Sequence, residues 1–196
     1  MRARCVFVWY PACGDPMQIV IREPSLEIHP ITGEELNAVL EVYRQCEDFL
    51  ALGPVPTASM KMVLKDIEIS HGYGGLFCGI YTAGDRMIGI IDYVPGNFEG
   101  NPRAAFLDLL MIAAPYRKQG LGQAVVEAVE NEIRKDTQVN VILSGVQVNN
   151  PLAIRFWQRN GYQIVSGPKL MPDQTTAYAL RKDLTGERRS HTVSQD

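Results

Sequence analysis

The stretch from Phe106 to Gly122 constrains the fold of this chain more than any other. Residues 106–114 (FLDLLMIAA) are apolar apart from Asp108, and Pro115 ends the run. Such a run predicts a strand that is buried on most of both faces of a sheet. From Gln123 onward, apolar residues recur every three or four positions with charged residues between them, which predicts an amphipathic helix.

The turn between that strand and that helix combines glycines with positive charge. Backbone N–H groups at a helix start have no partner within the helix, and the helix dipole makes that end positive. Two glycines would let an anion approach the backbone closely. Arg117 and Lys118 add full charges, and an arginine can hold two phosphate oxygens at once. The sequence therefore predicts a phosphate-binding cradle. Its residues are Arg117, Lys118, Gln119, Gly120, Leu121, Gly122 and Gln123.

Two common phosphate-binding loops do not fit this turn. The Walker loop has four residues between its glycines and then Lys-Ser/Thr, which is absent here. The dinucleotide loop G-x-G-x-x-G/A could begin at Gly120 and Gly122, but it then meets Val125. The remaining pattern, R-x-x-G-x-G from Arg117, resembles the pyrophosphate loop of the GNAT superfamily of N-acetyltransferases. A basic helix start with flexible glycines is the alternative interpretation of these residues.

A second motif lies downstream, after the β-branched run 139–148. Asn150 and Pro151 suit the N-cap and the first position of a helix, and Gly161 suits its C-cap. The stretch N-N-P-L-A-I-R-F-W-Q-R-N-G-Y resembles the second GNAT signature, N-P-x-A followed by an aromatic residue and a terminal Gly-Phe/Tyr. With two signatures in this order, the resemblance covers residues 26–184.

The resemblance implies an α/β (α+β) fold: a mixed, mostly antiparallel central sheet of six to seven strands with helices on both faces. Alternating and apolar runs predict the strands, and apolar residues at helical spacing predict the helices. The expected strands are 26–31, 76–83, 87–94, 106–114, 139–148, 162–166 and 176–181, and helices are expected to begin near residues 33, 60, 123 and 151.

One acetyltransferase domain, 17–184, is predicted between a peripheral N-terminal extension, 1–16, and a polar, disordered tail, 185–196. Composition argues against several function classes. The net charge of −3 argues against general nucleic-acid binding. No apolar run reaches the roughly 18 residues that span a membrane. The four cysteines are widely separated and no histidine lies at ligand spacing from them, so we expect no metal and a reducing, cytoplasmic location.

Acetyl-CoA is the co-substrate that the resemblance implies. Its pyrophosphate would lie on the cradle amides, and the backbone of the central strand, which splays from its neighbour in the family, would bind the pantetheine arm. The matching strand residues are Leu110, Met111 and Ile112. Asn150, Ala153 and Trp157 in the second signature would lie beside the same carrier.

The reaction that follows is N-acetylation of a primary amine by direct attack on the thioester, without a covalent enzyme intermediate. An amine of pKa near 10.4 must first lose a proton at neutral pH, and a carboxylate can accept it. Asp108, the one acid in the central strand, is the candidate base, and Asp92 is the runner-up. The alternative for Asp108 is a structural carboxylate. Burial would raise its pKa.

The acid that protonates the leaving thiolate is not assigned. Many family members have a tyrosine in the second signature helix, and the matching residue here is Trp157. The indole N–H of tryptophan donates hydrogen bonds but is not acidic enough to protonate the thiolate. A second function therefore stays open: a catalytically inactive acyl-CoA sensor or partner-binding module on the same fold. A longer acyl group, or another phosphorylated ligand such as NAD or ATP, also stays open.

The acceptor is predicted to be a small-molecule or peptide amine rather than nucleic acid or membrane. It would enter between the first helices, near Glu47, Asp48 and Phe49, and the loop 95–103. The two acids could attract a cationic amine, although exposed acids are more often simply solvated. The sequence leaves the oligomeric state, including a homodimer, open.

Overall fold

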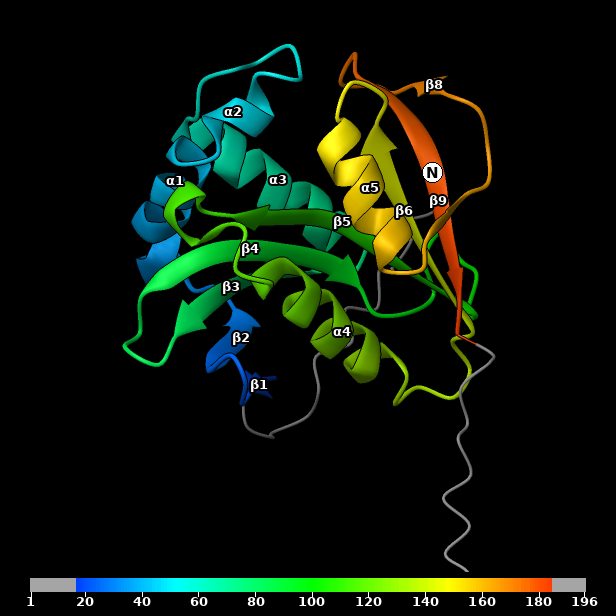
Figure 1. The fold of residues 1–196 in the computed structure, drawn as a ribbon, viewed down its shortest axis with the longest axis horizontal. Helices are drawn as coiled ribbons and strands as arrows, with labels where there is room; N and C mark the ends of the chain where they lie inside the picture. Colours follow the sequence, from blue (N-terminus) through cyan, green and yellow to red (C-terminus); the bar gives the residue numbers. More distant parts are fainter. Residues whose placement is uncertain (1–16, 185–196) are drawn as a thin grey trace, which may run out of the picture.

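A nine-stranded sheet runs through the computed structural model, which describes residues 17–184. The predicted extension 1–16 and tail 185–196 lie outside the described residues. The strand order is β1-β2-β3-β4-β5-β6-β9-β7, and β8 also pairs with β9 (Figure 1). Only β5 and β6 pair in parallel. The strands are β1 (Ile19–Ile21), β2 (Leu26–Pro30), β3 (Leu76–Thr82), β4 (Met87–Val94), β5 (Ala104–Ile112), β6 (Val141–Gln147), β7 (Gln163–Ile164), β8 (Lys169–Leu170) and β9 (Thr176–Asp183).

Helices cover both faces of the sheet, as Figure 1 shows. One face carries α1 (Leu36–Arg44), α2 (Glu47–Leu50) and α3 (Met60–Gly72), and the other carries α4 (Leu121–Ile133) and α5 (Pro151–Arg159). Short 3-10 turns, η1 (Gly33–Glu35) and η2 (Ala114–Tyr116), precede α1 and α4. Each face has its own buried apolar cluster. The predicted mixed, mostly antiparallel fold with helices on both faces is confirmed.

Local capping explains where several helices begin. The carboxylate of Glu35 accepts a 2.7 Å hydrogen bond from the backbone N–H of Thr32, the reach-back that a capping box provides. The Ser59 hydroxyl accepts from the backbone N–H of Met62 at 3.3 Å at the start of α3. The Asn150 side chain accepts from the backbone N–H of Ala153 at 3.0 Å at the start of α5. Side-chain oxygens thus satisfy N–H groups that a helix leaves unpaired.

The expected count of six to seven strands is too low. The structure adds β1, which has three residues, and β8, which has two and lies in a stretch expected to be a loop. Neither is long enough to show an alternation of apolar and polar residues. These strands are therefore decided by pairing with β2 and β9 rather than by local pattern.

β5 and β6 part from each other midway along their length. Their parallel pairing covers only Ala104–Leu107 and Val141–Ser144, although β5 continues to Ile112. The Ser144 hydroxyl donates to the carbonyl of Leu107 at 2.8 Å, at the last paired position. Beyond it, the facing backbone groups of the two strands have no ladder partner in each other, which leaves a V-shaped opening in the sheet.

Between residues 17 and 184, no helix is long and apolar enough to cross a membrane. In the same range, no group of three or more His, Cys, Asp or Glu side chains lies together as a set of metal ligands would. Cys46 and Cys78 are buried, free thiols.

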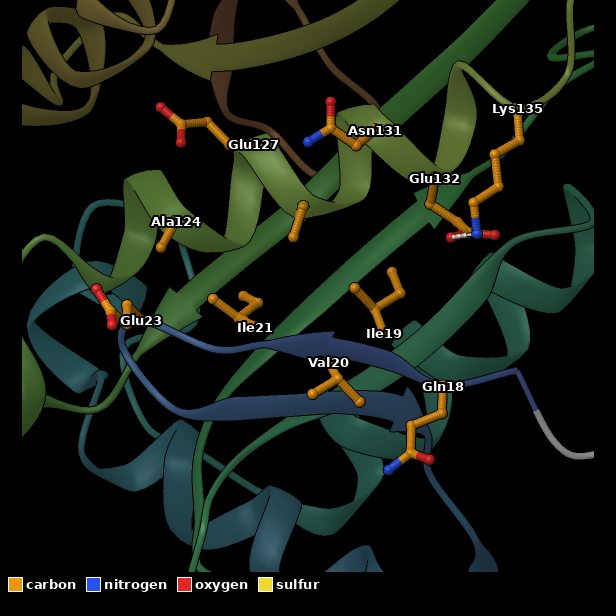
Figure 2. A pocket seen from close by; sticks show the side chains of 11 residues that line it. Gln18, Ile19, Val20, Ile21, Glu23, Ala124, Glu127, Asn131, Glu132 and Lys135 are labelled. Atoms are coloured by element: carbon orange, nitrogen blue, oxygen red, sulfur yellow. Dashed lines mark ion pairs between the residues drawn. The ribbon is translucent and has the colours of Figure 1, made fainter.

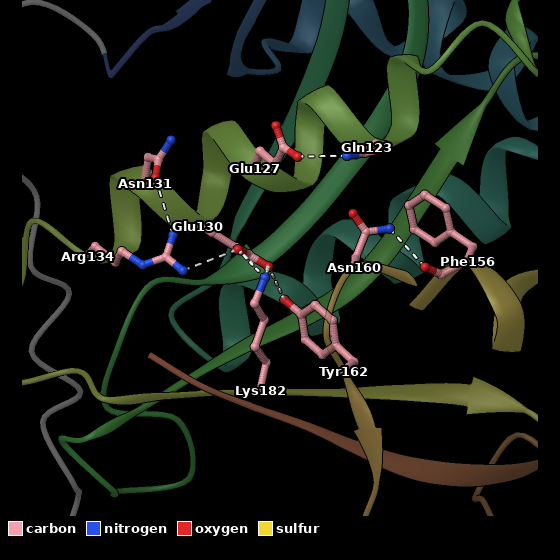
Figure 3. A network of polar contacts seen from close by, with 9 residues as sticks. All are labelled: Gln123, Glu127, Glu130, Asn131, Arg134, Phe156, Asn160, Tyr162 and Lys182. Atoms are coloured by element: carbon pink, nitrogen blue, oxygen red, sulfur yellow. Dashed lines mark hydrogen bonds and ion pairs between the residues drawn. The ribbon is translucent and has the colours of Figure 1, made fainter. Parts of the chain in front are cut away.

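A buried carboxylate ties α4 to the C-terminal strands. Glu130, which is 2% exposed, accepts from the Lys182 ammonium at 2.6 and 2.8 Å and from the Tyr162 hydroxyl at 3.0 Å (Figure 3). The guanidinium of Arg134, one turn along α4, lies 3.5 Å from the same carboxylate. These contacts compensate the cost of burying the charge, and they fix the helix that follows the predicted cradle.

Replacing Glu130 with alanine is expected to lower the free energy of unfolding by roughly 3–5 kcal/mol, because the largely buried Lys182 keeps its charge without a partner. Glu127→Ala is the matched control, one turn earlier on the same helix. Among the described residues its exposed side chain forms a hydrogen bond only with Gln123, and its effect should stay within about 0.5 kcal/mol. Urea unfolding of the two variants measures both. Equal losses would show that the Glu130 contacts do not stabilise the fold.

Candidate active site

The predicted cradle forms a row of free backbone donors at the start of α4. Lys118 and Gly120 both have left-handed backbone conformations, with φ of 62° and 79°, and this alternation curves the loop so that successive N–H groups converge. Within residues 17–184, no protein group accepts a hydrogen bond from any backbone N–H between Lys118 and Gln123. An anion is the ligand that such donors fit.

Arg117 does not point its charge into this cradle. Its guanidinium holds the Asp48 carboxylate with both terminal nitrogens, at 2.5 and 3.0 Å, and its Nε donates to the carbonyl of Ile112 at 2.7 Å. This pair holds the pKa of Asp48 below its usual range. In this structure the guanidinium is engaged by Asp48 and Ile112, and a contact of Arg117 with phosphate stays a prediction. Lys118 is exposed and leaves its charge available to an anion.

The central strand presents only part of its predicted backbone to the opening. Its residues alternate, and the Met111 carbonyl faces β4, since a Cβ on Gly89 would lie 2.5 Å from that oxygen. Leu110 and Ile112 therefore face the side where β6 departs. The Ile112 carbonyl already accepts from Arg117, and the Cys46 thiol lies 3.5 Å from it. The backbone of Leu110 is thus the best placed of the three for a ligand.

Asp108 lies at the apex of the opening. Asp92 of β4 pairs with Leu109 and Tyr93 pairs with Leu107, so Asp108 is the extra residue of a β-bulge. A bulge redirects a side chain out of the regular pattern, and Asp108 is exposed. The expectation that it is buried was wrong. Even so, the pKa of Asp108 is raised. The main cause is surrounding protein that displaces part of its water, and the charges of Asp66 and Asp173 add to this effect.

No hydrogen bond among the described residues supports the alternative, in which Asp108 is a structural carboxylate. Among residues 17–184, no donor forms a hydrogen bond to its carboxylate. Asp92 differs: it is 3% exposed and accepts a 2.7 Å hydrogen bond from the Ser70 hydroxyl of α3. Burial, together with the charge of Asp108, raises the pKa of Asp92 to about 7. The hydrogen bond from Ser70 only partly offsets this increase. A buried Asp92 cannot touch an acceptor directly, whereas Asp108 can.

Two acids near Asp108 were missed from the sequence. Asp66 in α3 accepts a 2.8 Å hydrogen bond from the buried Tyr43 hydroxyl, and Asp173 lies in the loop between β8 and β9. Both carry charges that raise the pKa of Asp108. Asp66 stands one helical turn from Val63 and Ser70 on the inner face of α3, and a polar residue on an apolar face is the signal that could have identified it. No local signal places Asp173.

The second signature helix contributes a cap and a core residue. The Asn150 side chain and the Ala153 N–H form the helix cap described above, beside the opening. Trp157 is 7% exposed and packs edge-on against Tyr162, with ring centroids 4.9 Å apart. The predicted contact between Trp157 and a carrier does not fit this placement, because the indole has almost no surface to offer. Phe156 instead lies next to the cradle, 3.4 Å from where a Cβ on Gly122 would be.

Two surface hollows lie away from Asp108. One, of about 410 Å³, separates β1 from α4; Figure 2 shows Ile19 and Ile21 pointing into it from the strand. It contains none of the predicted site residues. The other, of about 390 Å³, begins at Gln123 of the cradle and extends past Arg159 and Lys182.

Gly120→Ala is expected to lower the free energy of unfolding by about 1–2 kcal/mol, because a Cβ is unfavourable in the left-handed conformation, and to weaken anion binding at the cradle. No atom lies within 4 Å of the added Cβ, so the effect is one of backbone conformation. Gly33→Ala is the control, since it also has open space but no positive φ. Thermal melts with and without coenzyme A measure both effects. A Gly120→Ala protein that matches Gly33→Ala would contradict the predicted cradle.

Comparisons with known proteins identify the family and the fold. A family model described as "Acetyltransferase (GNAT) family" matches residues 36–162. The spermine/spermidine N(1)-acetyltransferase of Bacillus subtilis (strain 168) is 27% identical over 142 residues, which are 71% of this chain and 88% of that protein. The probable N-acetyltransferase san of Drosophila melanogaster is 35% identical over 65 residues, 33% of this chain and only 35% of that protein.

A solved structure shares the fold over nearly the whole described chain. The structure of AAC(6′)-Ib in complex with ribostamycin and coenzyme A superposes with a TM-score of 0.68 and 17% sequence identity. The superposition covers 87% of this chain and 99% of that one. At this identity, the likeness concerns the fold and not the ligands.

Proposed function

Since the chain belongs to the acetyltransferase (GNAT) family, we propose that this acyltransferase moves an acetyl group from acetyl-CoA to a primary amine. The observation that carries the proposal is the alignment of two features on one strand–turn–helix unit. Free N–H groups at 118–123 form an anion cradle, and the parted strands lead from it to an exposed carboxylate, Asp108.

The carrier would occupy the opening from the cradle to the apex. Its pyrophosphate would accept hydrogen bonds from the amides of Lys118 to Gln123, with Lys118 adding a full charge. An amide of its pantetheine arm would donate to the backbone carbonyl of Leu110, which has no partner in β6. The hollow that begins at Gln123 gives space for the rest of the carrier. Acetyl-CoA is the first carrier to test because the AAC(6′)-Ib structure with this fold is a complex with coenzyme A.

The reaction would proceed by direct attack in a ternary complex. Asp108, whose raised pKa makes it a stronger base, takes the proton from the ammonium form of the acceptor. The amine nitrogen then bonds to the thioester carbon, and the backbone N–H of Leu110 steadies the oxygen as it gains charge. The nitrogen releases its second proton to water as the carbon–sulfur bond breaks with the electron pair on sulfur, which leaves the neutral amide. Because Trp157 is buried, the thiolate takes its proton from water, which its pKa of about 8.5 permits.

The acceptor would be a cationic small-molecule amine, with a peptide amine as the second choice. Acids on three elements around the apex, Asp66, Asp92 and Asp108, together with Asp173, make this side of the sheet negative. A spermine/spermidine acetyltransferase is among the relatives. The acids first expected to attract the amine are otherwise engaged: Asp48 pairs with Arg117, and Glu47 accepts from the backbone N–H of Ala58 at 2.9 Å.

A thermal melt with acetyl-CoA tests the carrier. Saturation at about 100 times the dissociation constant stabilises the fold by about 2.7 kcal/mol, which for a chain of this size should raise Tm by roughly 5–10 °C. NAD and ATP serve as controls with other phosphates. A shift with NAD or ATP but none with acetyl-CoA would assign the cradle to another ligand and contradict the proposal.

The alternative of an acyl-CoA sensor without catalysis is favoured by one observation, the absence of an acid at Trp157. Release of free coenzyme A in the presence of an amine panel separates the two functions. An enzyme releases it continuously, in proportion to the amount of acetylated amine. A sensor shows the melting shift but no release with any amine.

Asp108→Asn is expected to lower kcat by roughly 10²–10⁴, the usual contribution of a general base, while the melting shift with acetyl-CoA is retained. The activity of the natural protein should fall as pH drops through the pKa of Asp108, because only the deprotonated carboxylate accepts a proton, and the variant should lose this dependence. Ser166→Ala, an exposed position distant from the apex in the chain, is the control. Turnover within about three-fold of the natural protein would exclude Asp108 as the base.

A further inference from the structure

We propose that three aromatic side chains next to Asp108, Tyr73, Phe98 and Phe106, form a wall that selects acceptors in which the amine carries a flat apolar group. Such acceptors are arylalkylamines. The inference rests on the proposed acetyl transfer and adds the residues that would determine acceptor specificity.

The three rings form one continuous stack. Phe98, in the loop between β4 and β5, lies flat on Phe106 of β5, with centroids 4.3 Å apart and planes 6° from parallel. Tyr73, the residue that ends α3, tilts onto Phe98 at 5.9 Å and 41°. Because Tyr73 belongs to the end of α3, the stack lies on the face of the sheet that α1 to α3 cover. This is the face that carries Asp92 and its partner Ser70.

The stack is held in place by the backbone of its loop. The N–H of Phe98 donates to the carbonyl of Ala104 at 3.0 Å, and the N–H of Asn101 donates to the carbonyl of Phe98 at 3.0 Å. Asn97 and Glu99, on either side of Phe98, both have positive φ, at 56° and 51°. That conformation is uncommon for residues other than glycine. These contacts hold the backbone of Phe98, and the stacking on Phe106 positions its ring.

Core packing does not account for these rings. Neither Phe98 nor Phe106 belongs to the buried cluster on either face of the sheet, and Tyr73 is 55% exposed. Aromatic rings that keep part of their surface in water are available to stack on another flat group, and stacking adds to the effect of apolar burial alone.

Sequence register places the wall beside the reacting group. Phe106 stands two residues before the bulged Asp108, where β5 parts from β6. On α3, Asp66, Ser70 and Tyr73 are spaced four and three residues apart and so follow one face of the helix. The site thus has acids around Asp108 and flat apolar surface at one end. A cationic nitrogen at Asp108 with an aryl group on the rings satisfies both.

The chemistry distinguishes this acceptor from a linear polyamine. A polyamine would use the acids but would leave the rings without a partner. An arylalkylamine would use both, and cation–π attraction would also favour its ammonium group near the ring faces. Phenethylamine and n-butylamine are matched probes, since they share the primary amine and differ in the aryl group.

Kinetics of the full chain with acetyl-CoA test the proposal. The natural protein should show kcat/KM about ten-fold higher for phenethylamine than for n-butylamine. Phe98→Leu, which keeps an apolar side chain but loses the flat face, should remove most of this preference and leave n-butylamine within about two-fold. Phe98→Tyr keeps the ring and should retain the preference. Tyr178→Leu, which removes a partly buried ring packed on the opposite core cluster, is the control.

Calorimetric binding of the two amines to the protein loaded with coenzyme A gives a readout that does not need turnover. Equal affinity for the two amines, or an equal loss for both in Phe98→Leu, would overturn the proposal. Preferred turnover of spermidine with no aryl preference would refute the aromatic wall and leave the acetyltransferase intact. Loss of the acetyl-CoA melting shift in the natural protein would instead refute the proposed function itself.

Discussion

The separation of β5 from β6 is the constraint on which the rest of the site depends. The two strands pair only as far as Leu107 and Ser144. At this last paired position the Ser144 hydroxyl donates a hydrogen bond to the Leu107 carbonyl. Backbone groups beyond that point would be costly to bury without partners. Arg117 and Cys46 satisfy one of them, the Ile112 carbonyl. The others are left to a ligand or to water, and this break in the ladder is the basis of the binding surface that we propose.

Charge divides this opening into two sides. At its outer end lie the free amides that begin α4 and the exposed Lys118, which favour an anion. At its apex lie Asp108 and the acids around it, which favour a cation. The bidentate pair of Arg117 with Asp48, together with the bond from Arg117 to the Ile112 carbonyl, joins α2 to the end of the central strand. A phosphorylated carrier and a cationic acceptor would therefore approach from opposite directions and meet at the bulge.

The parts of the fold with strong local patterns could be predicted, and the parts that depend on distant partners could not. The strand at β5, the helix after the glycine turn and the cap at Asn150 each follow from a few neighbouring residues; that helix begins at Leu121, two residues before the predicted Gln123. The short strands β1 and β8 carry no periodicity and exist because β2 and β9 provide edges. The sequence pattern could place Arg117 in the loop. It could not show that the guanidinium would form an ion pair with Asp48, which is far away in the chain.

The sequence by itself determined that a strand, a glycine turn and a helix would follow one another and leave free N–H groups at the helix start, because helix geometry and glycine conformations are local properties. Only the tertiary structure decided that Asp108 is an exposed bulge residue rather than a buried one, and that Asp66 and Asp173 lie near it. It also placed Trp157 in the core. These outcomes depend on strand register and on packing between segments far apart in the chain, which periodicity along the sequence does not encode.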